Sequence, residues 1–308
     1  MDGLAQFRVR ETCITCRSAR IEPVCEGHYA DEPLRGFLAA DPWGESPMPA
    51  LAGAWWRLVR CTECGTRFHG RILTPEWRAH CLRVWMSGDA IEAFEARDGQ
   101  AGFPSRFDKA AFWTGHVLSI EAMTRDGRRD PLKILDFGCG SGEFLAHAAL
   151  FGARAYGIDA SPARRAFAGR SEVSIVADLA DLPEELRGSF DAVTLFEVLE
   201  HLDDPRAVLE SLRPWVRQGG LLVLETPDAA HVSAIRTLDE YRLIHPLDHI
   251  NAFSPRTLGE IARLCGFRRV RRRLGYTSAG PVQTLKREAR RLLQIAAKPT
   301  TRQYFRAA

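Results

Sequence analysis

The chain has 308 residues, of which 45% are hydrophobic and 26% are charged, and its formal net charge is +3. This composition excludes a disordered or fibrous protein, and the length is sufficient for two domains. The first ten residues, MDGLAQFRVR, contain no apolar stretch of signal-peptide length, and apolar runs such as 221–224 are too short to span a bilayer. We therefore expect a cytoplasmic protein without a transmembrane segment.

Two Cys-x-x-Cys pairs, Cys13/Cys16 and Cys61/Cys64, lie in the first predicted domain, residues 1–75. Four thiolates in turn-like contexts suit a tetrahedral zinc ion, and a reducing compartment disfavours disulfides. The 44 residues between the pairs exceed the usual zinc-ribbon spacing, so additional structure must be inserted there. A redox dithiol is the alternative for one pair alone, but two pairs favour structural zinc.

Residues 76–130 are predicted to form a helical connector or cap. Apolar residues recur at helical spacing over 76–97 and again over 107–124. A break at 98–104 that contains Gly and Pro separates the two helices.

Short apolar runs alternate with helical patterns from residue 131 to residue 278. Strands are predicted at 133–137, 155–158, 173–176, 190–195 and 221–225, an edge strand at 270–274, and helices at 142–151, 205–215 and 254–265. Short, fully apolar runs are typical of buried parallel strands. The expected fold class is therefore α/β: a Rossmann-like, doubly wound, mostly parallel sheet with a small N-terminal zinc-ribbon-like domain.

Residues 279–308 are predicted to be a basic amphipathic tail with a helix over 283–297. From Arg263 to the C-terminus the sequence has thirteen Lys and Arg residues and one acid, Glu288. Such a segment attracts a polyanion or an anionic surface, and the alternative is an ordinary solvated basic face.

A turn with three glycines, Gly138, Gly140 and Gly142, follows the strand predicted at 133–137. Glycine allows the backbone to turn sharply and to approach a ligand closely. The spacing is G-x-G-x-G, and Glu143 occupies the position at which dinucleotide sites have a further glycine or alanine. Because its carboxylate would repel a pyrophosphate, the turn favours a ligand that has none.

Acidic residues end the next two predicted strands, Asp159 after the second and Asp178 after the third. A carboxylate at the first position can accept hydrogen bonds from both hydroxyls of a ribose. At the second position a side chain or backbone group can reach an adenine amine. Because the carboxyl ends of parallel strands meet at one edge of the sheet, we expect one nucleoside site there.

The segments ILDFGCGSGEF (134–144), YGIDAS (156–161), VADL (176–179) and FDAVTLFEVLEHLDDP (190–205) resemble the class I methyltransferases that use S-adenosylmethionine (SAM). The resemblance implies that Asp136 and the glycines hold the methionine end of SAM, that Asp159 holds the ribose and that Asp178 holds the adenine. The complete set of cofactor-binding residues expected on this basis is Asp136, Gly138, Cys139, Gly140, Gly142, Asp159, Ala160, Asp178, Leu179 and Phe196.

The motif Glu197-x-x-Glu200-His201 follows the strand predicted at 190–195. On a helical turn these side chains share one face, and together with His249 they are a reasonable set of ligands for a divalent metal ion. Such clusters hold an ion that activates a hydroxyl in the O-methyltransferases of small RNAs and quinones. The pair Asp248-His249 instead resembles the Glu-His acid/base pair of zinc-containing deoxysugar C-methyltransferases, with Asp in place of Glu. A purely structural role for both groups is the alternative.

We therefore expect a SAM-dependent methyltransferase with His249, Glu197 and His201 at its catalytic site. The cysteine segment joined to this domain resembles bacterial enzymes that methylate glycans and natural products, which implies a small-molecule or glycan acceptor and favours O- over C-methylation. The alternatives are an RNA methyltransferase, or a zinc-ribbon nucleic-acid-binding protein that uses the SAM fold as a scaffold or sensor.

Overall fold

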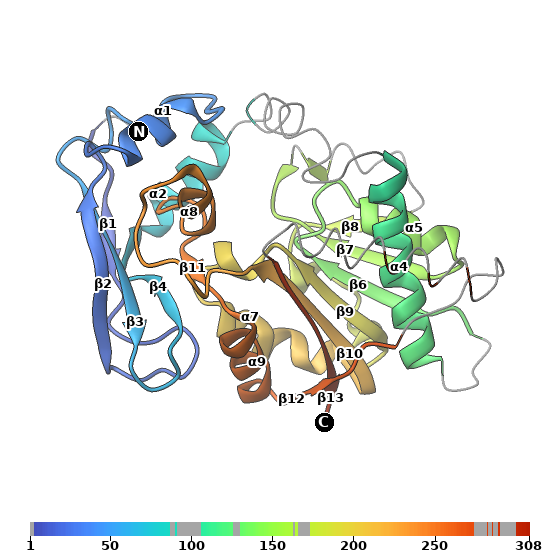
Figure 1. Cartoon of the computed structure of the whole chain (residues 1–308). Coiled ribbons are helices and arrows are strands. Elements are labelled where there is room, and N and C mark those ends of the chain that lie inside the picture. Colours follow the sequence, from blue (N-terminus) through green and yellow to red (C-terminus); the bar gives the residue numbers. More distant parts are fainter. Residues whose placement is uncertain are drawn as a thin grey trace. The chain divides into compact units, whose positions relative to one another are not determined.

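The computed structural model of the chain describes residues 3–86, 90, 106–125, 130–162, 164, 165, 173–273, 282, 285, 289 and 300–308 (Figure 1). The chain divides into two compact units. Unit 1 consists of Met1–Ala101, Leu199–Arg206 and Pro227–Ile261, and unit 2 consists of Gly102–Val198, Ala207–Thr226 and Ala262–Ala308. This division differs from the predicted linear one, with boundaries at 75, 130 and 278, because two segments from the second half of the chain pack with the N-terminal unit.

A seven-stranded sheet forms the centre of unit 2, in the strand order β12-β13-β10-β9-β6-β7-β8. Its strands are β6 (Lys133–Phe137), β7 (Arg154–Ile158), β8 (Ser174–Val176), β9 (Phe190–Phe196), β10 (Val216–Pro227), β12 (Phe267–Val270) and β13 (Thr300–Ala307). Strands β8, β7, β6, β9 and β10 pair in parallel, whereas β12 and β13 are antiparallel to each other. The predicted α/β class with a mostly parallel sheet is confirmed.

Helices α4 (Arg106–Thr124) and α5 (Glu143–Leu150) pack against this sheet. Apolar side chains from both helices share one core with side chains of β6, β9 and β10, among them Ile120, Phe144, Ile134, Ala192 and Leu221. Full burial of each large apolar side chain contributes about 1.5–3 kcal/mol. The core therefore explains why the strands are continuous apolar runs. The short helical elements of this half are η2 (Leu179–Asp181), η3 (Glu184–Leu186), α7 (Pro205–Leu212) and η5 (Arg213–Trp215).

Unit 1 contains a four-stranded antiparallel sheet, β11-β4-β3-β2, and a two-stranded sheet, β1-β5. The strands are β1 (Phe7–Val9), β2 (Ile21–His28), β3 (Trp55–Cys61), β4 (Arg67–His69), β5 (Arg71–Leu73) and β11 (Asn251–Ala252). The helices are α1 (Leu34–Ala40), α2 (Pro75–His80), the π-helix η1 (Cys81–Trp85), the 3₁₀ turn η4 (Leu199–His201), α8 (Leu238–Leu243) and the start of α9 (Pro255–Leu264). An apolar core that includes Tyr29, Leu58, Trp85 and Tyr241 joins segments from both halves of the sequence.

Strand β13 corrects the prediction of a basic tail over 279–308. Residues 300–307 occupy a position inside the sheet between β12 and β10, and Tyr304 and Phe305 are buried. Arg302 pairs with Glu225, and Arg306 donates hydrogen bonds to the carbonyls of Gly219 and Met123. Two arginines that the sequence suggested would face solvent therefore bind internal partners.

Three other predicted elements differ from the structure or lie wholly or partly outside the described residues. The last edge strand is β12 at Phe267–Val270 and not 270–274. The helix predicted over 283–297 lies outside the described residues apart from positions 285 and 289. Of the helix predicted over 76–97, the structure shows α2 and the π-helix η1, which ends at residue 85. Within the described parts of the chain, no helix has the length and apolarity needed to cross a membrane.

Candidate active site

The glycine turn lies directly after β6, as the sequence predicted. Gly138, Gly140 and Gly142 have φ angles of 73°, 57° and 78°, a left-handed backbone that side chains with a Cβ rarely adopt. A Cβ on Gly138 would lie 2.5 Å from a methyl group of Val198. The backbone nitrogens of Gly138 and Cys139 donate to the carbonyl of Ile158 at 2.7 and 3.1 Å, which ties the turn to the end of β7.

Asp159 holds the middle of the same turn. One carboxylate oxygen accepts a hydrogen bond from the backbone nitrogen of Gly140 at 2.8 Å, and the other accepts from that of Ser161 at 2.9 Å. The side chain is 7% exposed. Because each carboxylate oxygen has more than one lone pair, the group can fix the turn and still accept bonds from a ligand.

Asp136 is buried at the end of β6 and accepts a hydrogen bond from the hydroxyl of Thr194 at 2.6 Å. Burial raises the pKa of Asp136 to about 7, and the nearby charge of Asp159 adds to this rise, although the Thr194 hydrogen bond opposes it. A cationic ligand group would favour the ionised carboxylate. Asp136 is therefore suited to the ammonium of an amino acid.

The remaining predicted cofactor residues surround these acids at the carboxyl edge of the sheet. Asp178 is exposed and caps η2 by accepting a hydrogen bond from Ala180 at 2.9 Å, so Leu179 begins that turn. Phe196 ends β9 and packs with Trp113 and Phe144 at ring-centroid distances of 5.3 and 5.0 Å. Ala160 is exposed next to Asp159. Glycines without a Cβ, a buried acid and an exposed cap residue fit a zwitterionic nucleoside such as SAM.

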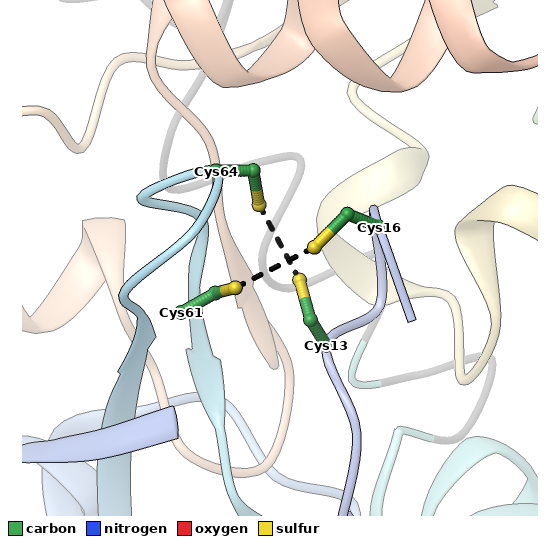
Figure 2. A group of neighbouring side chains, drawn as sticks. All are labelled: Cys13, Cys16, Cys61 and Cys64. Atoms are coloured by element: carbon green, nitrogen blue, oxygen red, sulfur yellow. Dashed lines mark hydrogen bonds between the residues drawn. The ribbon is translucent and has the colours of Figure 1, made fainter. Parts of the chain in front are cut away.

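The four predicted zinc ligands come together in unit 1 (Figure 2). The sulfurs of Cys13 and Cys64 are 3.5 Å apart, those of Cys16 and Cys61 are also 3.5 Å apart, and all four lie within 4.8 Å of one another. A tetrahedral zinc ion with Zn–S bonds of about 2.3 Å needs sulfurs about 3.8 Å apart. The donor set therefore fits zinc.

The surroundings favour a thiolate at Cys64, whereas the hydrogen bond with Cys64 and burial raise the pKa of Cys13, and burial raises the pKa of Cys16. A hydrogen bond from Cys13, together with those from the hydroxyl and backbone of Thr66, lowers the pKa of Cys64 to about 4. The residues inserted between the two cysteine pairs form β2, α1 and β3, which accounts for the unusually long spacing.

A second cluster in unit 1 consists of Glu200, His201 and His249, each with a potential metal-ligand atom within 4.8 Å of the others. Nδ1 of His201 lies 3.0 Å from a carboxylate oxygen of Asp248, and the rings of His201 and His249 are 4.8 Å apart. The structure thus brings together three of the four residues predicted for this site and adds Asp248.

The two histidines differ in charge. Burial opposes protonation of His201, but Asp248, with a smaller contribution from Glu200, outweighs it and raises the pKa of His201 to about 9. Burial, together with the positive charge of His201, lowers the pKa of His249 to about 3. At neutral pH the pair therefore carries one positive charge, on His201, and His249 is neutral.

Glu197 differs from the prediction of a shared helical face. Its φ angle is 56°, and η4 contains only Leu199–His201. The backbone nitrogen of Glu197 donates to the carbonyl of Glu225 at 2.9 Å, within unit 2. The left-handed backbone at Glu197 interrupts the helical turn, so the i, i+3 spacing does not bring its side chain into the Glu200 cluster.

Residues that the sequence analysis missed hold the histidine cluster in place. Asn251 donates to the carbonyls of Leu199 and Leu202, both at 2.7 Å, and accepts a 2.6 Å hydrogen bond from the buried Arg10. Arg78 donates to the carbonyls of Leu247 and His201. Long-range contacts such as these have no local sequence pattern. They show that the N-terminal segment helps to position both His201 and the loop that precedes His249.

Comparison with known proteins agrees with this geometry. The family model of the methyltransferase domain matches residues 116–271, about half of the chain. The chain belongs to this family. The methyltransferase match starts inside α4 and ends just after β12, so it includes the glycine turn, both strand-end acids and the histidine cluster.

Individual relatives match less of the chain. The ubiquinone biosynthesis O-methyltransferase of Xanthomonas campestris pv. campestris (strain B100) is 38% identical over 101 residues, which cover 30% of this chain and 42% of that protein. The enzyme of the same name from Xanthomonas euvesicatoria pv. vesicatoria (strain 85-10) is 37% identical over the same length. The chain thus spans less than half of the curated relatives it matches.

Among solved structures, phosphoethanolamine N-methyltransferase 2 of Haemonchus contortus, in complex with SAM, is similar with a TM-score of 0.50. The sequence identity is 18%, and the match covers 78% of this chain and 62% of that one. At this identity the likeness concerns the fold, and it supports the Rossmann-like class I methyltransferase architecture.

Proposed function

We propose that the protein transfers the methyl group of SAM to a hydroxyl of a small-molecule or glycan acceptor. The observation that carries this proposal is the left-handed glycine turn fixed by Asp159 beside the buried Asp136, in a chain of the methyltransferase family. SAM supplies the methyl group as a sulfonium, which is already activated. The protein then has to orient the acceptor and remove its proton.

In this proposal Asp136 and the glycine turn hold the methionine end of SAM, with Cys139 contributing its backbone. Asp159 and Ala160 bind at the ribose, and Asp178 and Leu179 bind at the adenine. Phe196, in its aromatic surroundings, packs against the cofactor.

His249 is the proposed base: its ring is neutral, and negative charge that develops on the acceptor would offset the burial and the charge of His201 that lower its pKa. His201, charged and bound to Asp248, would stabilise the oxyanion that forms on the acceptor. Glu197 is proposed to assist from the end of β9. O-methylation is favoured over C-methylation because Asp248 stands where the C-methyltransferase pair has Glu, and because the curated relatives are named as O-methyltransferases.

The transfer is tested by incubating the full chain with methyl-labelled SAM and an extract of the source organism, followed by fractionation. We expect label in small molecules or glycans, and we expect His249→Ala to abolish labelling without changing the affinity for SAM. His231→Ala, which removes an exposed histidine of the same unit, is the matched control and should label normally. Label in RNA would instead favour the RNA methyltransferase, and loss of SAM binding in His249→Ala would contradict a catalytic role.

A metal-assisted reaction is the second candidate, favoured by the close grouping of Glu200, His201 and His249. A divalent ion there would lower the pKa of the acceptor hydroxyl. Removing divalent ions with a chelator and restoring them one by one distinguishes the two: activity that needs an added ion supports the metal, and undiminished activity supports His249 as the base.

A further inference from the structure

A pocket of about 430 Å³ lies within unit 1, and none of the residues proposed to act in methyl transfer lines it. Small-molecule sites have volumes of about 300–1,000 Å³. The residues that line it come from β3, the turn after it, β4, the loop after β10, β11, and the residue before α9 with the first turn of that helix: Arg60, Gly65, Arg67, Ala229, Ala230, Ala252, Ser254, Pro255, Arg256 and Thr257. Three of these ten lining residues are arginines, and none of them is acidic.

The positive charge of Arg67 has no acidic counterpart in the lining. Its Nη1 donates to the carbonyls of Ala229, Ala230 and Val232 at 3.2, 2.7 and 3.1 Å, which orient the guanidinium without neutralising it. Its buried Nε has no hydrogen-bond partner among the described residues. Burial lowers the pKa of Arg67, and the charge of Arg60 adds to this. An anion in the pocket would relieve both effects.

Arg256, an exposed residue, adds a second guanidinium to the lining. A Cβ on Gly65 would lie 2.0 Å from its Nη2, so the glycine at this position leaves the room that the guanidinium occupies. Gly65 also has a φ angle of 75°, which follows from its place in the turn after Cys64. The turn that carries one zinc ligand therefore also admits the arginine.

Two further features set the charge of the pocket. Arg60 is paired with Glu22 at 2.9 Å, so its charge is largely balanced. The N-terminus of the ten-residue helix α9 contributes Pro255, Arg256 and Thr257 to the lining. Helix N-termini carry a partial positive charge that favours anions. Arg67, Arg256 and the helix together leave the pocket positive.

We infer that this pocket binds the phosphate or diphosphate group of a small phosphate ester. Arginine is suited to this chemistry because its planar fork donates two parallel hydrogen bonds to phosphate oxygens. The volume exceeds that of a single phosphate ion, so part of the esterified molecule can enter with it. The inference is independent of methyl transfer, since no residue of the pocket is assigned to SAM or to proton removal.

The test is calorimetric titration of the full chain, at fixed salt, with inorganic pyrophosphate and with glucose 1-phosphate, neither of which contains the adenine that SAM carries. We expect saturable binding of at least one probe. Arg256→Gln should weaken it about tenfold or more, as expected for loss of a hydrogen bond between charged groups. Tighter binding of glucose 1-phosphate indicates an ester ligand, and tighter binding of pyrophosphate indicates a free anion or a diphosphate end.

The matched control is Arg35→Gln, which removes the same charge from an exposed ion pair with Glu32 in the same unit but outside the pocket. It should bind the probes as the unaltered chain does. Equal weakening in both variants would mean only a general attraction of anions to the unit and would overturn the inference. Absence of saturable binding to the unaltered chain would overturn it as well. Thermal unfolding of each variant, measured alongside, identifies any loss caused by misfolding.

Discussion

Asp136 and Asp159 end neighbouring parallel strands, but their environments give them different tasks. One carboxylate oxygen of Asp159 accepts from Gly140 in the turn and the other accepts from Ser161, whereas Asp136 accepts a hydrogen bond from the Thr194 hydroxyl and has a pKa raised by burial. The sequence predicted both positions, since the strand-turn-acid pattern is local. It could not predict that Asp159 also fixes the glycine turn, because that hydrogen bond joins residues that follow two different strands.

The raised pKa of Asp136 predicts a pH-dependent affinity for SAM. Below a pKa of about 7 the carboxyl is protonated and loses its attraction for the ammonium of SAM, so the affinity should fall as the pH drops from 8 to 6. Calorimetry over this range should show the fall in the unaltered chain and a weak, nearly constant affinity in Asp136→Asn. Thr194→Val, which removes the hydrogen bond that opposes the rise, should move the transition to higher pH. An equal pH dependence in Asp136→Asn would show that another group is responsible.

At the scale of elements, the cysteine turns and the strands between them form a structure that the sequence predicted only in part. The two Cys-x-x-Cys pairs predicted the four candidate zinc ligands, and the long segment between the pairs predicted inserted structure. The strand β11 (Asn251–Ala252) could not be predicted as a member of this sheet, because it comes from 182 residues after β4 ends. Two residues of strand are too short for a periodic signal.

Zinc is expected to determine the stability of this unit. We predict one zinc ion per chain by elemental analysis, and loss of both zinc and cooperative unfolding in Cys61→Ser, since a structural zinc supplies roughly 10–16 kcal/mol of apparent binding energy. Cys25→Ser, a change at a half-buried cysteine outside the cluster, is the control and should retain the metal. A zinc-free chain of unchanged thermal stability would contradict the assignment.

An ion pair between Arg302 and Glu225 joins β13 to β10, and the amino-acid composition of the C-terminal segment did not indicate it. Both nitrogens of the Arg302 fork lie 2.6 Å from the Glu225 carboxylate, and both side chains are at least nine-tenths buried. The predicted basic tail included Arg302, because charge density alone does not distinguish a solvated arginine from a buried one. Its partner lies 77 positions earlier in the chain.

Breaking this pair should destabilise the sheet. Arg302→Met leaves the Glu225 carboxylate buried without its main partner and should lower the free energy of unfolding by about 3–5 kcal/mol in urea denaturation. The double variant Glu225→Met/Arg302→Met should recover part of that loss, because neither charge then remains buried. A double variant no more stable than the single one would show that the pair contributes mainly through packing.

At the scale of the whole molecule, the chain passes between the two units several times. The segments Leu199–Arg206 and Pro227–Ile261, which follow β9 and β10, belong to unit 1 with the four clustered cysteines. The alternation of strands and helices predicted the parallel strands of the central sheet, but it missed β13 and placed the edge strand at 270–274 instead of Phe267–Val270. It could not predict that these two segments belong to unit 1, because their packing against the N-terminal segment depends on long-range contacts such as those of Arg10 and Arg78.

SAM binding at the glycine turn can be tested directly by calorimetry on the unaltered chain and two glycine variants. The unaltered chain should bind one SAM, Gly138→Ala should lose binding, and Gly152→Ala should keep it. Both glycines have a left-handed φ, 73° and 78°, but a Cβ on Gly138 would meet Val198 at 2.5 Å, whereas no atom lies within 4 Å of one on Gly152. Equal affinity in all three chains, or no binding to the unaltered chain, would contradict the claim that this turn holds the methyl donor.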